Sequence, residues 1–215
     1  MITIALTKGR ILKEILPVLS SVGIETIEDV FSSRKLLFKT TNADIDLLIL
    51  RGTDVLTYTQ FGVADIGIVG KDMLLEHGSN QIYELYDLGI ARCKLMTARE
   101  KNKNINKPRI SVATKYVNVA KRYYATLGIQ ADIIKLYGGM ELAPITGLAD
   151  EIVDIVDTGQ TLAANGLEQI NFIADISSRL IVNEASFKVN NESVKAISKI
   201  IFDFSNKKYN SESND

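Results

Sequence analysis

The stretch Ile45–Gly70 reads IDLLILRGTDVLTYTQFGVADIGIVG and decides the fold class predicted for the chain. It contains two short apolar runs, Ile45–Leu50 and Asp65–Val69, on either side of a segment with helical character over Thr53–Phe61. Strands that are apolar on both faces are typical of a parallel sheet with helices on each side. The stretch therefore predicts a β-α-β unit within an α/β fold whose sheets are mainly parallel.

The same alternation of strands and helices continues through the rest of the chain. Leu36–Thr40 is an apolar run that could pair with Ile45–Leu50 as a hairpin or as an adjacent strand. Further strands are expected at Ile2–Leu6, Arg109–Ala113, Ala131–Leu136 and Ile152–Val156, further apolar runs at Ile170–Ile176 and Leu180–Val182, and helices at Ile11–Val22, Val117–Leu127, Met140–Leu148, from Leu162 and over about Glu192–Phe204.

The long polar loop Glu100–Pro108, EKNKNINKP, separates two such series and predicts two lobes. Residues 1–90 and 178–215 are expected to form the first lobe, and residues 91–177 the second. In a two-lobed α/β protein, the ligand site is expected in the cleft between the lobes, at the carboxyl ends of strands.

Composition and charge narrow the class of protein. The 215 residues are 46% hydrophobic and 24% charged, which is typical of a globular enzyme. With 25 basic and 26 acidic residues the net charge is −1, which argues against a nucleic-acid-binding surface. The N-terminal MITIALTKGR lacks the pattern of a signal peptide, and no apolar run approaches the roughly 18 residues that span a bilayer. A cytoplasmic location is expected.

The chain contains one cysteine, Cys93, and one histidine, His77. A lone cysteine cannot form an internal disulfide, which fits a reducing cytosol, and its apolar surroundings predict a buried structural thiol. One histidine leaves none to spare for a Ser-His-Asp site or a histidine-rich metal site. His77 precedes Gly78 near the end of a predicted helix, where a capping role is expected.

The stretch Val153–Leu162, VDIVDTGQTL, is a candidate site for a phosphorylated ligand. A predicted strand delivers Asp157 to a turn of Thr158, Gly159, Gln160 and Thr161 that leads into a helix. A helix N-terminus, hydroxyl donors and a glycine together suit a phosphate, and the neighbouring acids could then accept hydrogen bonds from ligand hydroxyls. From these residues alone, an ordinary helix N-cap that holds no ligand explains the turn about equally well.

Basic residues also follow or precede predicted strands elsewhere in the chain. Arg51 ends an apolar strand, and Asp54 is an obvious structural partner for its charge. The remaining positions of this kind, which solvated side chains would also explain, are Lys8, Gly9 and Arg10 after the first strand, Arg34 and Lys35 before Leu36, and Lys71 after Gly70.

Tyr116, Tyr123 and Tyr124 lie on one predicted helix, where core packing is a better interpretation than base stacking.

The longer stretch Glu141–Leu162, ELAPITGLADEIVDIVDTGQTL, resembles the signature of the ATP phosphoribosyltransferases. The matching positions are Glu141, Gly147, Ala149, Ile152, Asp154, Ile155, Thr158, Gly159, Thr161 and Leu162. Further segments that are similar to this family are ALTKGRI at 5–11, SSRKLLF at 32–38, ILRGTDV at 49–55, ADIGIVGKD at 64–72, YELYDLGIARCKLM at 83–96 and ATKYVNVA at 113–120. The resemblance is to the short form of the family.

The resemblance implies transfer of the 5-phosphoribosyl group from 5-phosphoribosyl 1-pyrophosphate to N1 of ATP, with release of pyrophosphate, as the first step of histidine biosynthesis. It implies that Thr158–Thr161 bind the 5-phosphate, and that Asp154, Asp157 or Glu141 bind ribose hydroxyls. Arg10 and Arg34 are the expected catalytic residues, at the pyrophosphate and ATP phosphates, with Lys8, Gly9, Arg51, Lys71 and Gln160 as further substrate-binding residues.

The family also implies a fold similar to type II periplasmic binding proteins and Mg²⁺ that is chelated by the substrates, so that no metal-ligand cluster is expected in the protein. The partners it implies are a second copy of the chain in a homodimer and a regulatory subunit similar to histidyl-tRNA synthetase. Two alternatives stay open from the residues themselves: a non-catalytic ligand-binding module of the periplasmic type, and a phosphoribosyltransferase that uses a free base.

Overall fold

The computed structural model describes residues 1–105 and 107–212, with side chains up to Lys207 in the last helix. The chain folds into two compact units. The first contains Met1–Leu74, Gly78–Ala91 and the described residues from Ser177 onward, and the second contains Leu75–His77 and Arg92–Ile176. No helix among the described residues is both long enough and apolar enough to cross a membrane.

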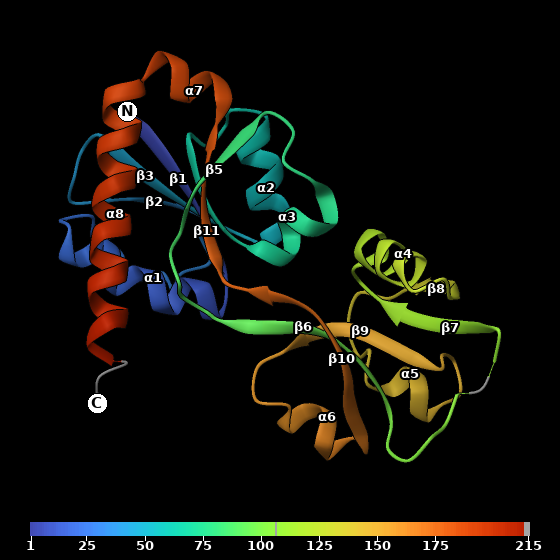
Figure 1. Cartoon of the computed structure of the whole chain (residues 1–215). Coiled ribbons are helices and arrows are strands. Elements are labelled where there is room, and N and C mark those ends of the chain that lie inside the picture. Colours follow the sequence, from blue (N-terminus) through green and yellow to red (C-terminus); the bar gives the residue numbers. More distant parts are fainter. Residues whose placement is uncertain (106, 213–215) are drawn as a thin grey trace. The chain divides into compact units, whose positions relative to one another are not determined.

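The first unit has a six-stranded sheet in the order β2-β3-β1-β4-β11-β5 (Figure 1). The strand β1 (Ile2–Thr7) is parallel to both β3 (Ile45–Leu50) and β4 (Ile66–Gly70). The two strands of the predicted β-α-β unit therefore exist, but β1 lies between them. The remaining strands are antiparallel to their neighbours: β2 (Leu37–Lys39), β5 (Ile82–Asp87) and β11 (Ser178–Asn183).

Helices cover both faces of this sheet, as the apolar character of its strands predicts. Ile4 and Leu6 of β1 pack in one core cluster with α1 (Arg10–Ser21) and α8 (Asn191–Glu212). Ala5 between them faces a second cluster with α2 (Gly52–Gln60) and the first part of α3 (Lys71–His77). The short helix α7 (Glu184–Val189) leads into α8.

The second unit has a five-stranded sheet in the order β10-β6-β9-β7-β8. At one side β7 (Arg109–Thr114) is parallel to β8 (Gln130–Lys135) and to β9 (Glu151–Val156). At the other side β6 (Cys93–Glu100) is antiparallel to β9 and to β10 (Leu167–Ile176). Three helices complete this unit: α4 (Val117–Thr126), α5 (Leu142–Ile145) and α6 (Gln160–Ala164) (Figure 1).

The α/β fold is confirmed, and the expectation of mainly parallel sheets is corrected, because both sheets are mixed. The antiparallel pairs come largely from strands at which the chain enters or leaves a unit. Thus β6 begins at Cys93, just after the chain enters the second unit at Arg92, while β10 ends at Ile176 and β11 begins at Ser178, on either side of the return to the first unit. The strands that enter or leave a unit, β6, β10 and β11, are thus antiparallel to their neighbours.

Several predicted elements differ from the observed ones. The helix expected over Met140–Leu148 is restricted to α5, and the helix expected from Leu162 begins at Gln160 and ends at Ala164. Gly166 then adopts a positive φ of 71°, and β10 starts directly after it. The polar loop after Glu100 lies inside the second unit.

Candidate active site

Three loops with basic residues follow neighbouring parallel strands of the first unit. Lys8 and Gly9 follow β1, Arg51 follows β3, and Lys71 follows β4. Because β3, β1 and β4 are adjacent and parallel, their carboxyl ends lie at one edge of the sheet. The loops are also connected directly, since the Lys8 N–H donates to the Leu50 carbonyl at 2.7 Å. We call Lys8, Gly9, Arg10, Arg34, Arg51 and Lys71 the basic edge.

Arg34 belongs to this edge because β2 runs antiparallel to β3. Leu37, the first residue of β2, is in register with Leu48, and the Ile49 N–H donates to the Leu36 carbonyl at 2.8 Å. Arg34 therefore comes just before the end of β2 that lies beside the carboxyl end of β3. Its side chain is exposed and makes no hydrogen bond or ion pair to the residues that the structure describes.

Other side chains of the basic edge are already held by carboxylates. Arg10 Nε donates to Glu14 Oε1 at 2.8 Å, and Glu14 Oε2 accepts from the Ala91 N–H at 2.7 Å. Lys71 Nζ donates to Glu84 Oε2 at 2.6 Å. The predicted Arg51–Asp54 side-chain pair is absent from the described part of the chain. Instead the Asp54 N–H donates to the Arg51 carbonyl at 2.9 Å, because Arg51 is the N-cap of α2. The Arg51 side chain is exposed.

The signature stretch forms a strand, a tight turn and a short helix in the second unit. After β9, Asp157 and Thr158 lead to Gly159, which has the left-handed φ of 78° and is the N-cap of α6. Leu162 anchors α6 in the core of this unit, while Asp157, Thr158, Gln160 and Thr161 are exposed. The first N–H groups of a helix have no acceptor within the helix, so this turn presents donors to a ligand. We call Asp157–Thr161 the phosphate turn.

Asp154 lies on β9 just before this turn and is the more buried of the two aspartates. Its side chain is 17% exposed, and Asp154 Oδ1 lies 3.9 Å from Lys115 Nζ. The same oxygen accepts from the Ile155 N–H at 2.9 Å. Lys115 follows β7, the parallel neighbour of β9, so its position at a strand end could have been inferred by the rule used for Lys8 and Lys71.

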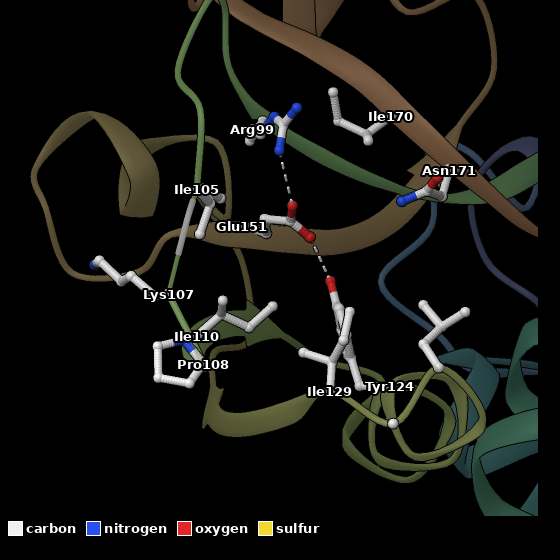
Figure 2. Close-up of a pocket in the computed structure, with 12 residues that line it drawn as sticks. Arg99, Ile105, Lys107, Pro108, Ile110, Tyr124, Ile129, Glu151, Ile170 and Asn171 are labelled. Atoms are coloured by element: carbon white, nitrogen blue, oxygen red, sulfur yellow. Dashed lines mark hydrogen bonds and ion pairs between the residues drawn. The ribbon is translucent and has the colours of Figure 1, made fainter.

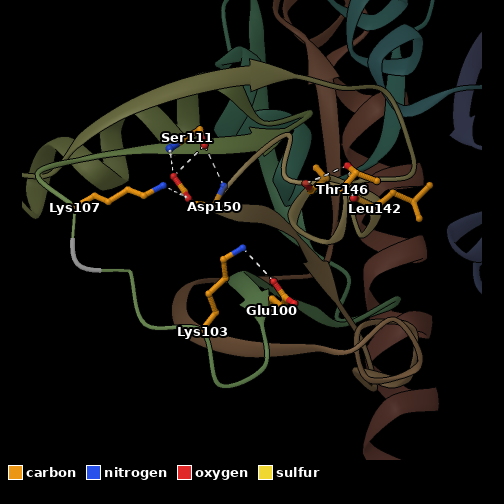
Figure 3. Close-up of polar contacts among 8 residues, drawn as sticks. Glu100, Lys103, Lys107, Ser111, Leu142, Thr146 and Asp150 are labelled. Atoms are coloured by element: carbon orange, nitrogen blue, oxygen red, sulfur yellow. Dashed lines mark hydrogen bonds and ion pairs between the residues drawn. The ribbon is translucent and has the colours of Figure 1, made fainter.

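Glu141 is the N-cap residue of α5 and is half-buried. Its neighbour Met140 packs in the same core cluster as Ile152 and Val156 of β9 and Leu162 of α6. The Glu141 segment and the phosphate turn are therefore fixed on one core. The Thr146 hydroxyl closes α5 by donating to the Leu142 carbonyl at 2.9 Å (Figure 3).

The opposite end of β9 is fixed by Asp150. Asp150 Oδ2 accepts from the Ser111 N–H and hydroxyl, each at 3.0 Å, and Oδ1 accepts from Lys107 Nζ at 2.7 Å (Figure 3). Burial by itself raises the pKa of Asp150, but the hydrogen bonds from Lys107 and Ser111 outweigh it and lower the pKa below its ordinary value. These contacts join the starts of β7 and β9.

The tyrosines and the single cysteine and histidine lie outside this candidate site. Tyr116 and Tyr124 are buried, which confirms core packing for both, and Tyr123 is half-buried. Cys93 is half-buried at the start of β6, so the prediction of a buried thiol holds only in part. His77 is the last residue of α3, and Gly78 follows it as C-cap.

No group of three or more His, Cys, Asp or Glu side chains among the described residues is arranged to hold a metal ion. The acidic residues near the phosphate turn, Glu141, Asp154 and Asp157, come from separate positions of the chain, and Asp154 is engaged by Lys115 and by the Ile155 N–H.

The sequence of the chain is similar to that of a known protein family. A family model described as HisG: ATP phosphoribosyltransferase matches residues 51–204. The chain belongs to the ATP phosphoribosyltransferase family. An ATP phosphoribosyltransferase from Saccharophagus degradans is 62% identical over 196 residues, covering 91% of this chain and 92% of that protein. One from Hahella chejuensis is 61% identical over 196 residues, covering 91% of this chain and 93% of its own length.

Solved structures agree with the family and with the fold. The ATP phosphoribosyl transferase (HisG:HisZ) complex from Thermotoga maritima contains a similar chain, with a TM-score of 0.84 and 33% identity over 96% of this chain and 100% of that one. The periplasmic aliphatic sulphonate binding protein SsuA from Escherichia coli has a TM-score of 0.63 at 12% identity, over 99% of this chain and 75% of that one, which shows likeness of fold alone. The predicted resemblance to ATP phosphoribosyltransferases and to the periplasmic binding fold is confirmed.

Family membership removes one of the alternatives and leaves the residue roles as predictions. A non-catalytic binding module does not account for relatives at about 60% identity that are named as transferases. Two residues that the sequence did not single out lie beside the predicted site residues: Lys115, next to Asp154, and Gln169, whose side-chain amide lies against Gly159. The contact of Gln169 depends on the pairing of β10 in the sheet and carries no local sequence signal.

Proposed function

We propose that this chain transfers the 5-phosphoribosyl group of 5-phosphoribosyl 1-pyrophosphate to N1 of ATP and releases pyrophosphate, the first step of histidine biosynthesis. The observation that carries the proposal is the signature stretch Glu141–Leu162, in which Asp154 and Asp157 come just before a glycine turn at the start of α6. The names of relatives that cover more than nine-tenths of the chain support the same activity.

The phosphate turn binds the 5-phosphate of the donor in this proposal. The left-handed Gly159 allows close approach of the backbone, and the exposed Thr158 and Thr161 supply hydroxyl donors beside backbone N–H groups. Since phosphate oxygens only accept hydrogen bonds, a turn composed of donors suits them.

The acidic residues near this turn bind the ribose. Ionised carboxylates accept hydrogen bonds, and ribose hydroxyls are the neutral donors that lie a few bonds from the 5-phosphate. Asp154 is suited to this role because Lys115 and the Ile155 N–H fix one of its oxygens. Asp157 and Glu141 are the further candidates.

The basic edge binds the pyrophosphate and the ATP phosphates. In the reaction the N1 lone pair of adenine forms a bond to the anomeric carbon, while the bond from that carbon to pyrophosphate oxygen breaks and its electron pair leaves with pyrophosphate. Arg10 and Arg34 stabilise this growing negative charge, since guanidinium groups stay charged and bind phosphates in a bidentate manner. No side chain is required to move a proton to the leaving group.

Mg²⁺ enters this reaction as part of the substrate, chelated by the donor's pyrophosphate and hydroxyl oxygens, because Mg²⁺ is commonly bound through substrate phosphates rather than by a protein cage. When bound there it neutralises part of the leaving-group charge.

The proposal extends to partners and location. The solved complex from Thermotoga maritima pairs a HisG chain with HisZ, and we propose an equivalent regulatory partner, similar to histidyl-tRNA synthetase, for this chain. A homodimer and a cytoplasmic location are proposed with it, and the single cysteine fits a reducing compartment.

The direct test mixes the purified chain with ATP, 5-phosphoribosyl 1-pyrophosphate and Mg²⁺, and follows pyrophosphate release together with the ultraviolet change of N1-substituted adenine. Both signals are expected, with or without the regulatory subunit. Absence of product in both conditions would exclude the activity. Product formed with a free base in place of ATP would favour the other class of phosphoribosyltransferase.

Single variants separate the two sets of residues. Asp157→Ala and Thr161→Ala should weaken binding of the phosphoribosyl donor by about tenfold or more and leave ATP binding nearly unchanged, whereas Thr126→Ala on α4 serves as a matched control.

Arg34→Ala should slow the chemical step in single turnovers. Its control is Lys35→Ala, because Lys35 Nζ is already paired with Glu28 at 2.5 Å. An unchanged single-turnover rate in Arg34→Ala would remove it from the catalytic residues.

A further inference from the structure

A cavity lies in the second unit at the end of its sheet where β7 and β9 begin. It has a volume of about 400 Å³, which is within the range of small-molecule sites. Glu151, the first residue of β9, and Ile110 of β7 line it, whereas the phosphate turn follows the last residue of β9 (Figure 2). The cavity is therefore separated from the phosphate turn by the length of β9, and the proposed transferase reaction does not use it.

Arg99 lines this cavity with a guanidinium that has one ion-pair partner and no hydrogen bond to the described residues. Its side chain is 23% exposed, and its Nε is buried without a hydrogen-bond partner. The closest charge is Glu151 Oε1, at 3.6 Å from Arg99 Nη1, which is an ion pair but too long for a hydrogen bond. Among the described residues the guanidinium thus makes no hydrogen bond, although a buried donor left unpaired costs about 1–3 kcal/mol.

The other charged groups of the cavity are already engaged. Glu151 Oε2 accepts from the Tyr124 hydroxyl at 2.6 Å, and Lys107 Nζ donates to Asp150 at 2.7 Å (Figures 2 and 3). Burial, followed by the charge of Glu151, raises the pKa of Tyr124 well above its ordinary value, so the hydroxyl stays protonated as a donor. Arg99 is left as the group with hydrogen-bonding capacity to spare.

A break in the regular strand places two further residues at the cavity. The pairing of β10 with β6 shifts between Gln169 and Phe172, so Ile170 and Asn171 lie in a bulge. The Asn171 N–H donates to the Thr97 hydroxyl at 3.1 Å, and both Ile170 and Asn171 line the cavity (Figure 2). Bulges redirect side chains and are frequent beside functional sites. The Asn171 side-chain amide makes no hydrogen bond to the described residues and is available as a second donor.

The rest of the lining is apolar and comes from the loop before β7, from β7 and β10, and from the segment that follows α4. Its members are Ile105, Pro108, Ile110, Leu127, Gly128, Ile129 and Ile170. A ligand that fits this lining carries an apolar body and one polar end. Because the cavity offers a single guanidinium that makes no hydrogen bond to the described residues, and its ion-pair partner Glu151 is itself negative, a monoanion matches the charge better than a phosphate with two charges.

We propose that this cavity is a binding site for a small monocarboxylate with an apolar body. The carboxylate accepts hydrogen bonds from the Arg99 guanidinium and the Asn171 amide, and the body packs against the isoleucines and Pro108. Tyr124 and Glu151 position Arg99, since Glu151 faces the guanidinium and is itself held by the tyrosine.

The test titrates phenylacetate into the purified full chain by isothermal calorimetry, without ATP or 5-phosphoribosyl 1-pyrophosphate, so its result is independent of the transferase activity. Phenylacetate should bind, and phenylacetamide, which has the same body without the charge, should bind at least about tenfold more weakly. Inorganic phosphate at the same concentration should not displace phenylacetate.

Three variants assign the binding to the cavity. Arg99→Gln should weaken phenylacetate binding by about tenfold or more, and Asn171→Ala, on an exposed part of an edge strand, by about threefold to tenfold. Arg109→Gln is the matched control, because Arg109 pairs with Asp132 and does not line the cavity. No binding by the unmodified chain up to about 10 mM, equal binding by all three variants, or displacement by phosphate overturns the proposal.

Discussion

Gly159 of the phosphate turn lies so close to Gln169 of β10 that a Cβ at position 159 would overlap the Gln169 side-chain amide. The backbone at Gly159 also has a φ of 78°, a conformation that residues with a side chain rarely adopt. The backbone conformation therefore favours glycine at this position, and a Cβ there would in addition displace the flexible end of the Gln169 side chain.

Gly159→Ala should raise the KM for 5-phosphoribosyl 1-pyrophosphate by about tenfold or more, because the turn must shift, and should leave the KM for ATP within about twofold. The double variant Gly159→Ala/Gln169→Ala removes the overlap but keeps the backbone strain. Partial recovery of donor binding in the double variant is expected from steady-state kinetics. Equal donor KM values for Gly159→Ala and the unmodified chain would contradict the assigned turn.

Lys115 should contribute to donor binding by holding Asp154 in place. Its Nζ lies 3.9 Å from Asp154 Oδ1, and the Lys115 side chain is one-third exposed, so the interaction is weak. Lys115→Gln should raise the KM for the donor by about threefold to fivefold, as expected for the loss of a partly exposed ion pair of up to about 1 kcal/mol. Lys121→Gln, an exposed lysine on α4, is the control and should have no effect on steady-state kinetics.

Much of the first unit could be predicted because its strands are apolar on both faces. Runs such as Ile45–Leu50 and Ile66–Gly70 are short, are bounded by helical segments and identify themselves by composition. Their order in the sheet could not be predicted from the chain order. The two strands follow one another in the chain with a helix between them, but β1 lies between them in the sheet. The strands β5 and β10 instead mix polar and apolar residues without a regular alternation. Their antiparallel pairing depends on where the chain changes unit.

The candidate site was predictable where residues follow strands and was missed where contacts are tertiary. Lys8, Arg51 and Lys71 follow three adjacent strands, so a strand-end rule finds them, and the same rule would have found Lys115. Gln169 and Arg99 carry no such signal. Their surroundings arise from the pairing of β10 with β6 and from its bulge, which a single sequence does not reveal.

Glu76 should stabilise the second unit by capping α4 from another segment. Its carboxylate is 6% exposed and accepts from the N–H groups of Asn118 and Val119 at 2.9 and 3.0 Å, whereas the N-cap residue Tyr116 supplies no side-chain cap. Glu76→Ala should lower the free energy of unfolding by about 2–3 kcal/mol, because two N–H groups near the helix start lose their acceptor.

Glu76→Gln provides the graded comparison, since its single amide oxygen can take the place of Oε2, which accepts from both N–H groups, whereas its amide nitrogen cannot accept the further bond that Asn118 N–H makes to Oε1. Its loss in urea denaturation should be about half that of Glu76→Ala. Glu100→Ala, which removes only an exposed ion pair with Lys103, should change stability by less than about 0.5 kcal/mol. A loss in Glu76→Ala no larger than in this control would show that the cap is not a major source of stability.

Asp150 should make the stability of the second unit fall in acid. Its side chain is 13% exposed, and its pKa is lowered in the folded protein, where the hydrogen bonds from Lys107 and Ser111 outweigh the opposing effect of burial. A lowered folded pKa means that the stabilisation is complete above the ordinary value of 3.8 and is lost as the pH falls through the folded pKa.

Asp150→Asn cannot titrate, so its unfolding free energy should be lower near neutral pH and should decline less between about pH 5 and 3. Urea denaturation at a series of pH values measures both slopes. Asp175→Asn, which removes an exposed carboxylate of β10, controls for the general effect of lost surface charge, and an acid slope in Asp150→Asn as steep as that of the unmodified chain would rule out Asp150 as its source.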